Sequence, residues 1–171
     1  MTILFAISLV AILNEASACT KIWSFETMNS DSGPVGAVLA KNGRTLYIGA
    51  GNTDDGKVYA VDTATGNQTW VHTMSPQLTP PVLSPDSKTL FVVGFNASRT
   101  SIRLTLQALN AASGTQKWAF DMFGPQQNYY FGSGPAAVAP NGHTVYAANF
   151  SELHAVEANS GKQLWSFTTG D

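Results

Sequence analysis

The sequence has little cysteine, little charge and no long apolar run. Its one cysteine, Cys19, rules out an internal disulfide. Charged residues make up 12% of the chain, against roughly 25% in an average globular protein, and the net charge is −2. We therefore expect no nucleic acid and no acidic membrane surface as a partner. The three histidines lack the spacing of zinc ligands, and the chain has no nucleophile-elbow or phosphate-loop motif.

The longest apolar run, residues 3–13, is too short for a transmembrane helix, which takes about 20 residues. The tripeptide Ala-Ser-Ala that ends at Ala18 has the small residues of a signal-peptidase site, although no Lys or Arg precedes the run. This pattern predicts a signal peptide at residues 1–18 and a secreted or extracytoplasmic chain, with a hydrophobic edge strand as the alternative. Cys19 would then be either a lipidated cysteine, in a bacterial source, or an N-terminal residue without a special role.

Fifteen glycines and eight prolines, with many Ser, Thr and Asn, are typical of a turn-rich all-β chain. The four tryptophans repeat at separations of 47, 48 and 47 residues. A common motif precedes the last three: Ala, then Asp, Asn or Glu two positions later, then Ser or Thr followed by Gly, and finally Trp. The repeated residues are Trp23, then Asp62, Gly66 and Trp70, then Asn110, Gly114 and Trp118, and then Glu157, Gly161 and Trp165.

Each repeat also has a turn of the Asn-Gly type midway, for example at Asn42-Gly43 and Asn141-Gly142. We expect four short antiparallel strands in a unit: one that begins at the Trp, one on each side of the turn, and one that ends at the Asp, Asn or Glu. Four strands in about 45 residues predict a β-propeller blade. The repeats would fill residues 19–171, with blades at about 23–69, 70–117 and 118–164 and the opening strand of a fourth at 165–171.

The motif resembles the tryptophan-docking repeat of the PQQ-like (pyrroloquinoline quinone) β-propeller family, in the quinoprotein alcohol dehydrogenase-like superfamily. The first copy matches its pattern at Ala60, Asp62, Thr65, Gly66 and Trp70, with Asn where Lys is usual. The later copies substitute Asn or Glu for Asp and Ser for Thr. The resemblance implies that each Trp wedges between neighbouring blades and has a structural role. Because propellers close with about four to eight blades, we expect a fragment of a ring of roughly seven or eight, completed by further blades or by self-association.

Enzymes of this family hold the quinone with Ca²⁺, an aspartate base and often a disulfide of adjacent cysteines, which one cysteine cannot form. Intact blade motifs without these residues favour a non-enzymatic extracytoplasmic scaffold or binding module that needs no cofactor. Its partner, a protein or a small molecule, is not identified by the sequence. The alternative is the N-terminal portion of a PQQ- and Ca-dependent dehydrogenase that oxidises alcohols or sugars.

Two loops contain candidate site residues, and neither contains a predicted catalytic residue. The enlarged loop of the third repeat has Tyr129, Tyr130 and Phe131, which suit contact with a sugar or peptide, unless they cover the core or the next blade. The loop at residues 52–56 clusters oxygens of the kind that hard cations prefer, although a plain hairpin turn is favoured there and no metal site is predicted.

Overall fold

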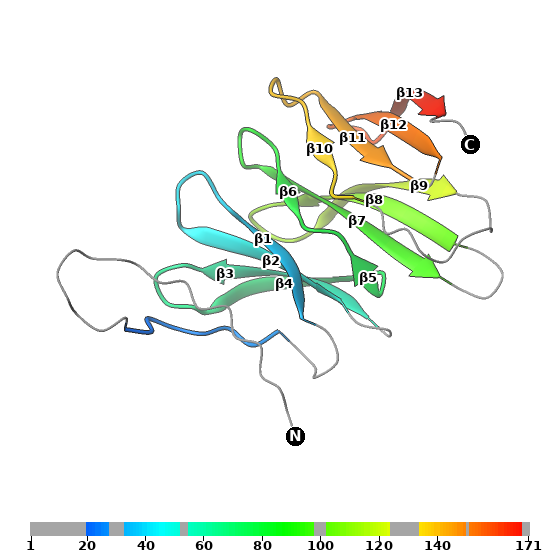
Figure 1. Cartoon of the computed structure of the whole chain (residues 1–171). Helices are drawn as coiled ribbons and strands as arrows, with labels where there is room; N and C mark the ends of the chain where they lie inside the picture. Colours follow the sequence, from blue (N-terminus) through cyan, green and yellow to red (C-terminus); the bar gives the residue numbers. More distant parts are fainter. Residues whose placement is uncertain are drawn as a thin grey trace.

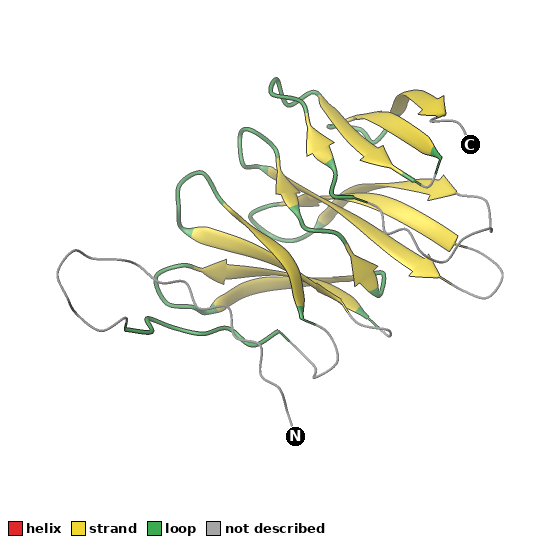
Figure 2. Ribbon diagram, in the orientation of Figure 1, coloured by secondary structure: helices red, strands yellow, loops and turns green. Residues whose placement is uncertain are grey.

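The computed structural model describes residues 20–27, 33–51, 55–97, 102–123, 134–149 and 151–168. These residues form thirteen strands in three antiparallel sheets and no helix (Figures 1 and 2), which confirms the predicted fold class. Figure 1 shows the sheets following one another in chain order as an unclosed stack. Within this described part of the chain, no helix exists that could span a membrane. The predicted signal peptide and Cys19 lie outside the described residues.

The first and third sheets each have four strands in sequential order. Sheet one consists of β1 (Pro34–Leu39), β2 (Thr45–Gly51), β3 (Gly56–Asp62) and β4 (Gln68–Met74). Sheet three consists of β10 (Ala137–Val138), β11 (Thr144–Ala148), β12 (Glu152–Glu157) and β13 (Gln163–Thr168). In both, short hairpins join neighbouring strands, so that the strands pair in the order of the chain.

The second sheet has an interrupted first edge. Its long strands are β7 (Thr89–Ala97), β8 (Ile102–Asn110) and β9 (Gln116–Phe123), and the short strands β5 (Gln77–Leu78) and β6 (Val82–Leu83) both pair with β7. Pro80 and Pro81 separate the two short strands. Because proline has no backbone N–H, it cannot donate to the ladder, and it is therefore confined to such edges.

The tryptophan strands occupy a different place from the one that the sequence predicts. Trp70 lies in β4, the last strand of sheet one, and Trp165 lies in β13, the last strand of sheet three, instead of opening the next blade. Residues 165–168 therefore belong to sheet three and do not open a fourth blade, and the sheets run from β1 to β4, β5 to β9 and β10 to β13. The observed strands lie where the repeat predicts them, at Trp70, Trp118 and Trp165, on each side of the turn and before the Asp, Asn or Glu. However, a periodic motif has no intrinsic first strand. Only hydrogen-bond pairing decides which sheet a strand joins.

A β-bulge lies beside the tryptophan in every last strand. In sheet one, Ala60 pairs with Trp70 but the next residue pairs with Gln68, so Thr69 has no partner in the register. The same shift occurs next to Ala108 in sheet two and Ala155 in sheet three. A bulge increases the local twist and turns a side chain. The alanine that pairs with each tryptophan is fully buried.

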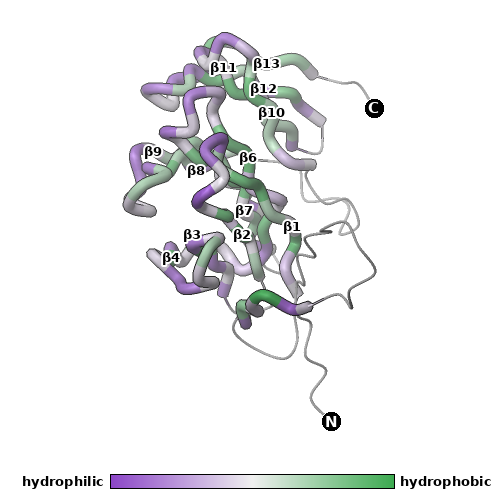
Figure 3. Tube along the Cα trace, turned by 90° about the vertical axis from the view of Figure 1, so that its left-hand side faces the viewer, coloured by the Kyte–Doolittle hydropathy of each residue, from purple (hydrophilic) through white to green (hydrophobic). Residues whose placement is uncertain are grey.

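The hydrophobic core lies between the sheets. One cluster, which includes Phe91, Leu104 and Val156, fills the space between sheets two and three, and a second, with Val58 and Leu90, fills the space between sheets one and two. A third covers the outer face of sheet one, where Trp23 and Phe25 pack against it. Figure 3 shows hydrophobic residues along the strands and hydrophilic ones at the turns. Each sheet is thus stabilised by its neighbours.

Candidate functional site

Three tryptophans join adjacent layers of the fold through the same hydrogen bond. The indole N–H of Trp70 in sheet one donates to the carbonyl of Ala111 in sheet two at 3.1 Å. Trp118 in sheet two donates to the carbonyl of Ala158 in sheet three at 3.0 Å. Trp23, in the segment 20–27 that precedes sheet one, donates to Thr63 at 2.7 Å. The fourth, Trp165, is 47% exposed. We call the three contacts made by Trp23, Trp70 and Trp118 the seams.

Each ring in a seam lies on a motif glycine of the next sheet. Gly66, Gly114 and Gly161 have φ angles of 72–75°, a left-handed conformation that residues with a Cβ adopt only at a cost. A Cβ at Gly114 would lie 2.6 Å from Cε3 of Trp70, and one at Gly161 would lie 2.7 Å from Cδ2 of Trp118. The glycine is therefore required twice, for the backbone angle and for the approach of the ring.

The polar motif residue closes the turn under the ring. The carboxylate of Asp62 accepts hydrogen bonds from the backbone N–H of Ala64 and Thr65 and from the Thr65 hydroxyl, at 2.9–3.0 Å. The side chain of Asn110 accepts the two equivalent backbone bonds in sheet two. Glu157 instead accepts from the hydroxyl of Ser160. These bonds fix the carbonyl that each tryptophan recognises, so the predicted motif residues Asp62, Asn110 and Glu157 all lie at the seams.

Stability is expected to fall in acid because of such carboxylates. The backbone and hydroxyl bonds from Thr65 hold the pKa of Asp62 below its usual value, and the Ser84 hydroxyl and the Arg103 guanidinium do the same for the pKa of Asp86 and of Asp121. A lowered folded-state pKa stabilises the fold above the unfolded pKa of about 3.9, and this contribution is lost as the pH falls through the folded value.

The variant Asp62→Asn tests this dependence. It should keep the turn, because Asn110 makes the same backbone bonds in sheet two. The urea midpoint at pH 7 should be somewhat lower than that of the wild type, because Asn lacks the charge that strengthens these hydrogen bonds, and the further loss between about pH 4 and pH 2 should be smaller in the variant. If the variant lost as much stability between about pH 4 and pH 2 as the wild type, the acid sensitivity would come from the other carboxylates.

A second column of contacts runs beside the tryptophans. In each seam, the second residue after the Trp contacts a residue of the next sheet. That residue lies three positions before the Asp, Asn or Glu of the motif. Phe25 and Tyr59 pack edge to face with ring centroids 5.3 Å apart, and Phe120 and His154 do so at 5.6 Å. In the middle seam, Nε2 of His72 lies 3.1 Å from the side-chain oxygen of Gln107. The chemistry of this column therefore changes from seam to seam.

The two other histidines do not form a metal site. His154 is buried, and its Nε2 lies 3.3 Å from the Asn149 amide and 3.5 Å from the carboxylate of Glu152. His143 is exposed in the turn between β10 and β11, where its backbone N–H donates to Asn141. In the part of the chain that the structure describes, no three His, Cys, Asp or Glu residues cluster as ligands of a metal ion.

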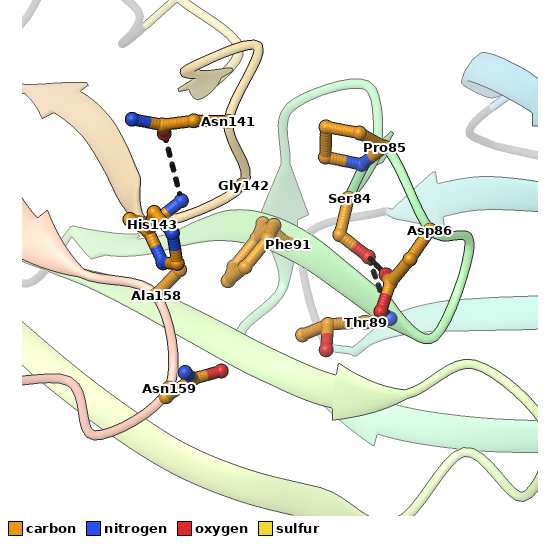
Figure 4. Close-up of a pocket in the computed structure, with 10 residues that line it drawn as sticks. All are labelled: Ser84, Pro85, Asp86, Thr89, Phe91, Asn141, Gly142, His143, Ala158 and Asn159. Atoms are coloured by element: carbon orange, nitrogen blue, oxygen red, sulfur yellow. Dashed lines mark hydrogen bonds between the residues drawn. The ribbon is translucent and has the colours of Figure 1, made fainter.

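A crevice of about 230 Å³ opens between sheets two and three (Figure 4). The turn before β7 forms one wall, with Pro85 and Asp86, and the turn before β11 forms the other, with Asn141 and His143. The hydroxyl of Ser84 bridges to Asp86 and to the backbone of the same turn. The sequence did not indicate this crevice, because its walls come from two turns more than fifty residues apart. One signal was present: His143 stands where the other repeats have Arg44 and Lys88.

The two candidate loops give no site in the described residues. Tyr129, Tyr130 and Phe131 lie outside them, as do residues 52–54 of the predicted cation loop. Of that loop, Asp55 forms an ion pair with Lys57 at 2.8 Å. A lysine that already neutralises its carboxylate makes Asp55 a poor calcium ligand.

Comparison with known proteins places the chain among propellers. A family model described as outer membrane protein assembly factor BamB matches residues 8–171. BamB from Moraxella catarrhalis aligns with a TM-score of 0.64 and 22% identity, over 89% of this chain and 44% of that one. The Cps50 (Swd1) β-propeller domain from Myceliophteria thermophila aligns with a TM-score of 0.58 and 14% identity, over 83% and 42%. This chain thus spans less than half of either structure, and no curated protein matches its sequence.

Proposed function

The chain belongs to the PQQ-like β-propeller family whose model is described as outer membrane protein assembly factor BamB, and from this premise we propose that it is a non-enzymatic scaffold that binds another protein outside the cytoplasm. By analogy with that description, the bound protein would be one that is being assembled. An extracytoplasmic place is supported by the predicted signal peptide at residues 1–18.

The observation that carries the proposal is how the repeat uses its residues. Three of the four tryptophans, with the glycines and turn residues that they contact, are occupied in the seams, where they hold adjacent layers together. Between the described sheets, the crevice is bounded by exposed turns with Asn141, His143 and Asn159. Its volume of about 230 Å³ is below the roughly 300–1,000 Å³ of small-molecule sites. An opening of this size suits one or two side chains of a protein partner.

Site-specific photo-crosslinking tests the proposal in the source organism. A crosslinking residue at His143 should give an adduct with a partner protein, because His143 lies on the crevice rim. The same residue at Arg44, which has the equivalent position in the turn of sheet one, is the matched control and should give little adduct. The mass of the chain in those cells should correspond to a start at Cys19 if the chain is exported.

Two outcomes would contradict the proposal. Equal adducts at His143 and Arg44 would show that the crevice is not a specific contact. Quinone-dependent dye reduction after addition of PQQ and Ca²⁺ to the full-length natural protein would favour the dehydrogenase alternative instead.

A further inference from the structure

The last strand of the described chain presents an apolar surface to solvent. In β13, Leu164 is 52% exposed, Trp165 is 47% exposed and Phe167 is 61% exposed. The equivalent Trp118 in sheet two is only 9% exposed, because sheet three covers it. A surface with two adjacent exposed aromatic rings is typical of a contact site.

Trp165 already has the orientation that the other tryptophans have in their seams. Its ring lies 6.0 Å from that of Tyr146 at an angle of 46°. Trp118 lies 5.9 Å from Phe91 at 44°, and Trp70 lies 5.8 Å from Tyr47 at 36°. The aromatic neighbour within the sheet thus holds each ring in place, and Trp165 needs little reorganisation to dock, which lowers the cost of binding.

The seams define what β13 would bind. Its partner must provide a turn with a left-handed glycine and an outward carbonyl for Trp165, as Gly161 and Ala158 do for Trp118. It must also provide a neighbour for Phe167, the residue two positions after the tryptophan. In the three seams this neighbour is Tyr59, Gln107 or His154. Only Tyr59 packs against a phenylalanine from a Trp-Ser-Phe sequence, which is Phe25. The best match is therefore the outer face of sheet one.

That face is covered by a segment that lies outside the described sheets. Residues 20–27 cover it through Trp23 and Phe25, with the same Trp-Ser-Phe sequence as β13. This segment belongs to none of the three described sheets, whereas the tryptophans on Gly114 and Gly161 come from hydrogen-bonded strands, β4 and β9. The Gly66 turn is thus the one of the three whose tryptophan belongs to no described strand, so displacing this tryptophan would break no sheet pairing.

We propose that β13 of one copy binds the outer face of sheet one of a second copy, where Trp165 and Phe167 replace Trp23 and Phe25. The contact is head to tail, so it closes if the rotation between copies permits. Residues 20–27 compete within their own chain at a high effective concentration, and this keeps the isolated chain largely monomeric.

Sedimentation of the purified full chain over a range of concentrations tests the proposal. Trp23→Ala removes the competitor, and the dissociation constant of the dimer should fall by roughly tenfold or more. Trp23→Ala combined with Trp165→Ala should return the chain to the monomer. Ile22→Ala is the control, because this side chain is 62% exposed in the same segment and should leave the monomer unchanged.

A labelled peptide with the sequence of residues 163–168 gives a second readout that does not depend on dimer formation. It should bind the Trp23→Ala chain, and a peptide with alanine in place of its tryptophan should not. A Trp23→Ala chain that stays monomeric and does not bind the peptide would overturn the proposal and assign β13 to a different occupant. Both measurements use the chain alone, so they are independent of any adduct at His143.

Discussion

Replacing Trp118 with alanine is expected to lower the free energy of unfolding by about 3–5 kcal/mol, the range for truncation of a large buried aromatic side chain. The ring is 9% exposed and packs between Phe91 and Gly161. Its loss leaves a cavity in the middle of the core cluster between sheets two and three. It also leaves the buried carbonyl of Ala158 without its donor, which adds to the cost. Urea unfolding followed by circular dichroism measures the change.

Trp165→Ala is the matched comparison. It removes the same side chain from the same place in the repeat, but this ring is 47% exposed and no described sheet lies on it. We expect a loss of about 1 kcal/mol or less at concentrations where the chain is monomeric. Equal losses for Trp118→Ala and Trp165→Ala would show that the ring acts within its own sheet and that the seam adds nothing.

Gly114→Ala is expected to cost about 2–5 kcal/mol, although it adds only one methyl group. The φ angle of 72° makes any residue with a Cβ unfavourable by about 1–2 kcal/mol. The new Cβ would also lie 2.6 Å from a ring atom of Trp70, so the ring must move, and such overpacking costs about 1–3 kcal/mol. The free energy of unfolding should fall, and near-ultraviolet circular dichroism should show a changed environment of tryptophan.

Gly43→Ala separates the two causes. Gly43 has a φ angle of 71°, but a Cβ there would meet no atom within 4 Å. This variant should therefore show the conformational cost alone, about 1–2 kcal/mol, and an unchanged tryptophan signal. If Gly114→Ala cost no more than Gly43→Ala, the close approach of Trp70 would have no energetic weight.

The sequence was sufficient for the fold because its strongest signals are local and repeated. The spacing of Trp70, Trp118 and Trp165, with the glycine that precedes each, predicted four-stranded units correctly. It could not show that the tryptophan strand ends a sheet, since periodicity does not depend on where a unit is said to begin. The partner of each ring lies one repeat further along, as Gly114 does for Trp70, and no local pattern indicates this offset.

The candidate sites were harder to predict for a related reason. The crevice unites Asp86 with His143, which lie in turns of different sheets. The second column of contacts pairs His72 with Gln107 but Phe120 with His154, so its residue types do not repeat. A pattern search detects what recurs, and these positions vary. The variation itself is visible only when the sheets are placed side by side.

That variation has a consequence for how the chain avoids misfolding. Proteins with similar units risk stacking the wrong units on each other during folding. The tryptophan and glycine contacts are the same in all seams and would accept any neighbour. The second column differs, because His72 pairs with the polar side chain of Gln107 and would lose this hydrogen bond if a phenylalanine stood in its place. Such a loss disfavours a wrong stacking order. The tryptophan contacts therefore hold the sheets together, and the contacts of the second column favour the native order of the sheets.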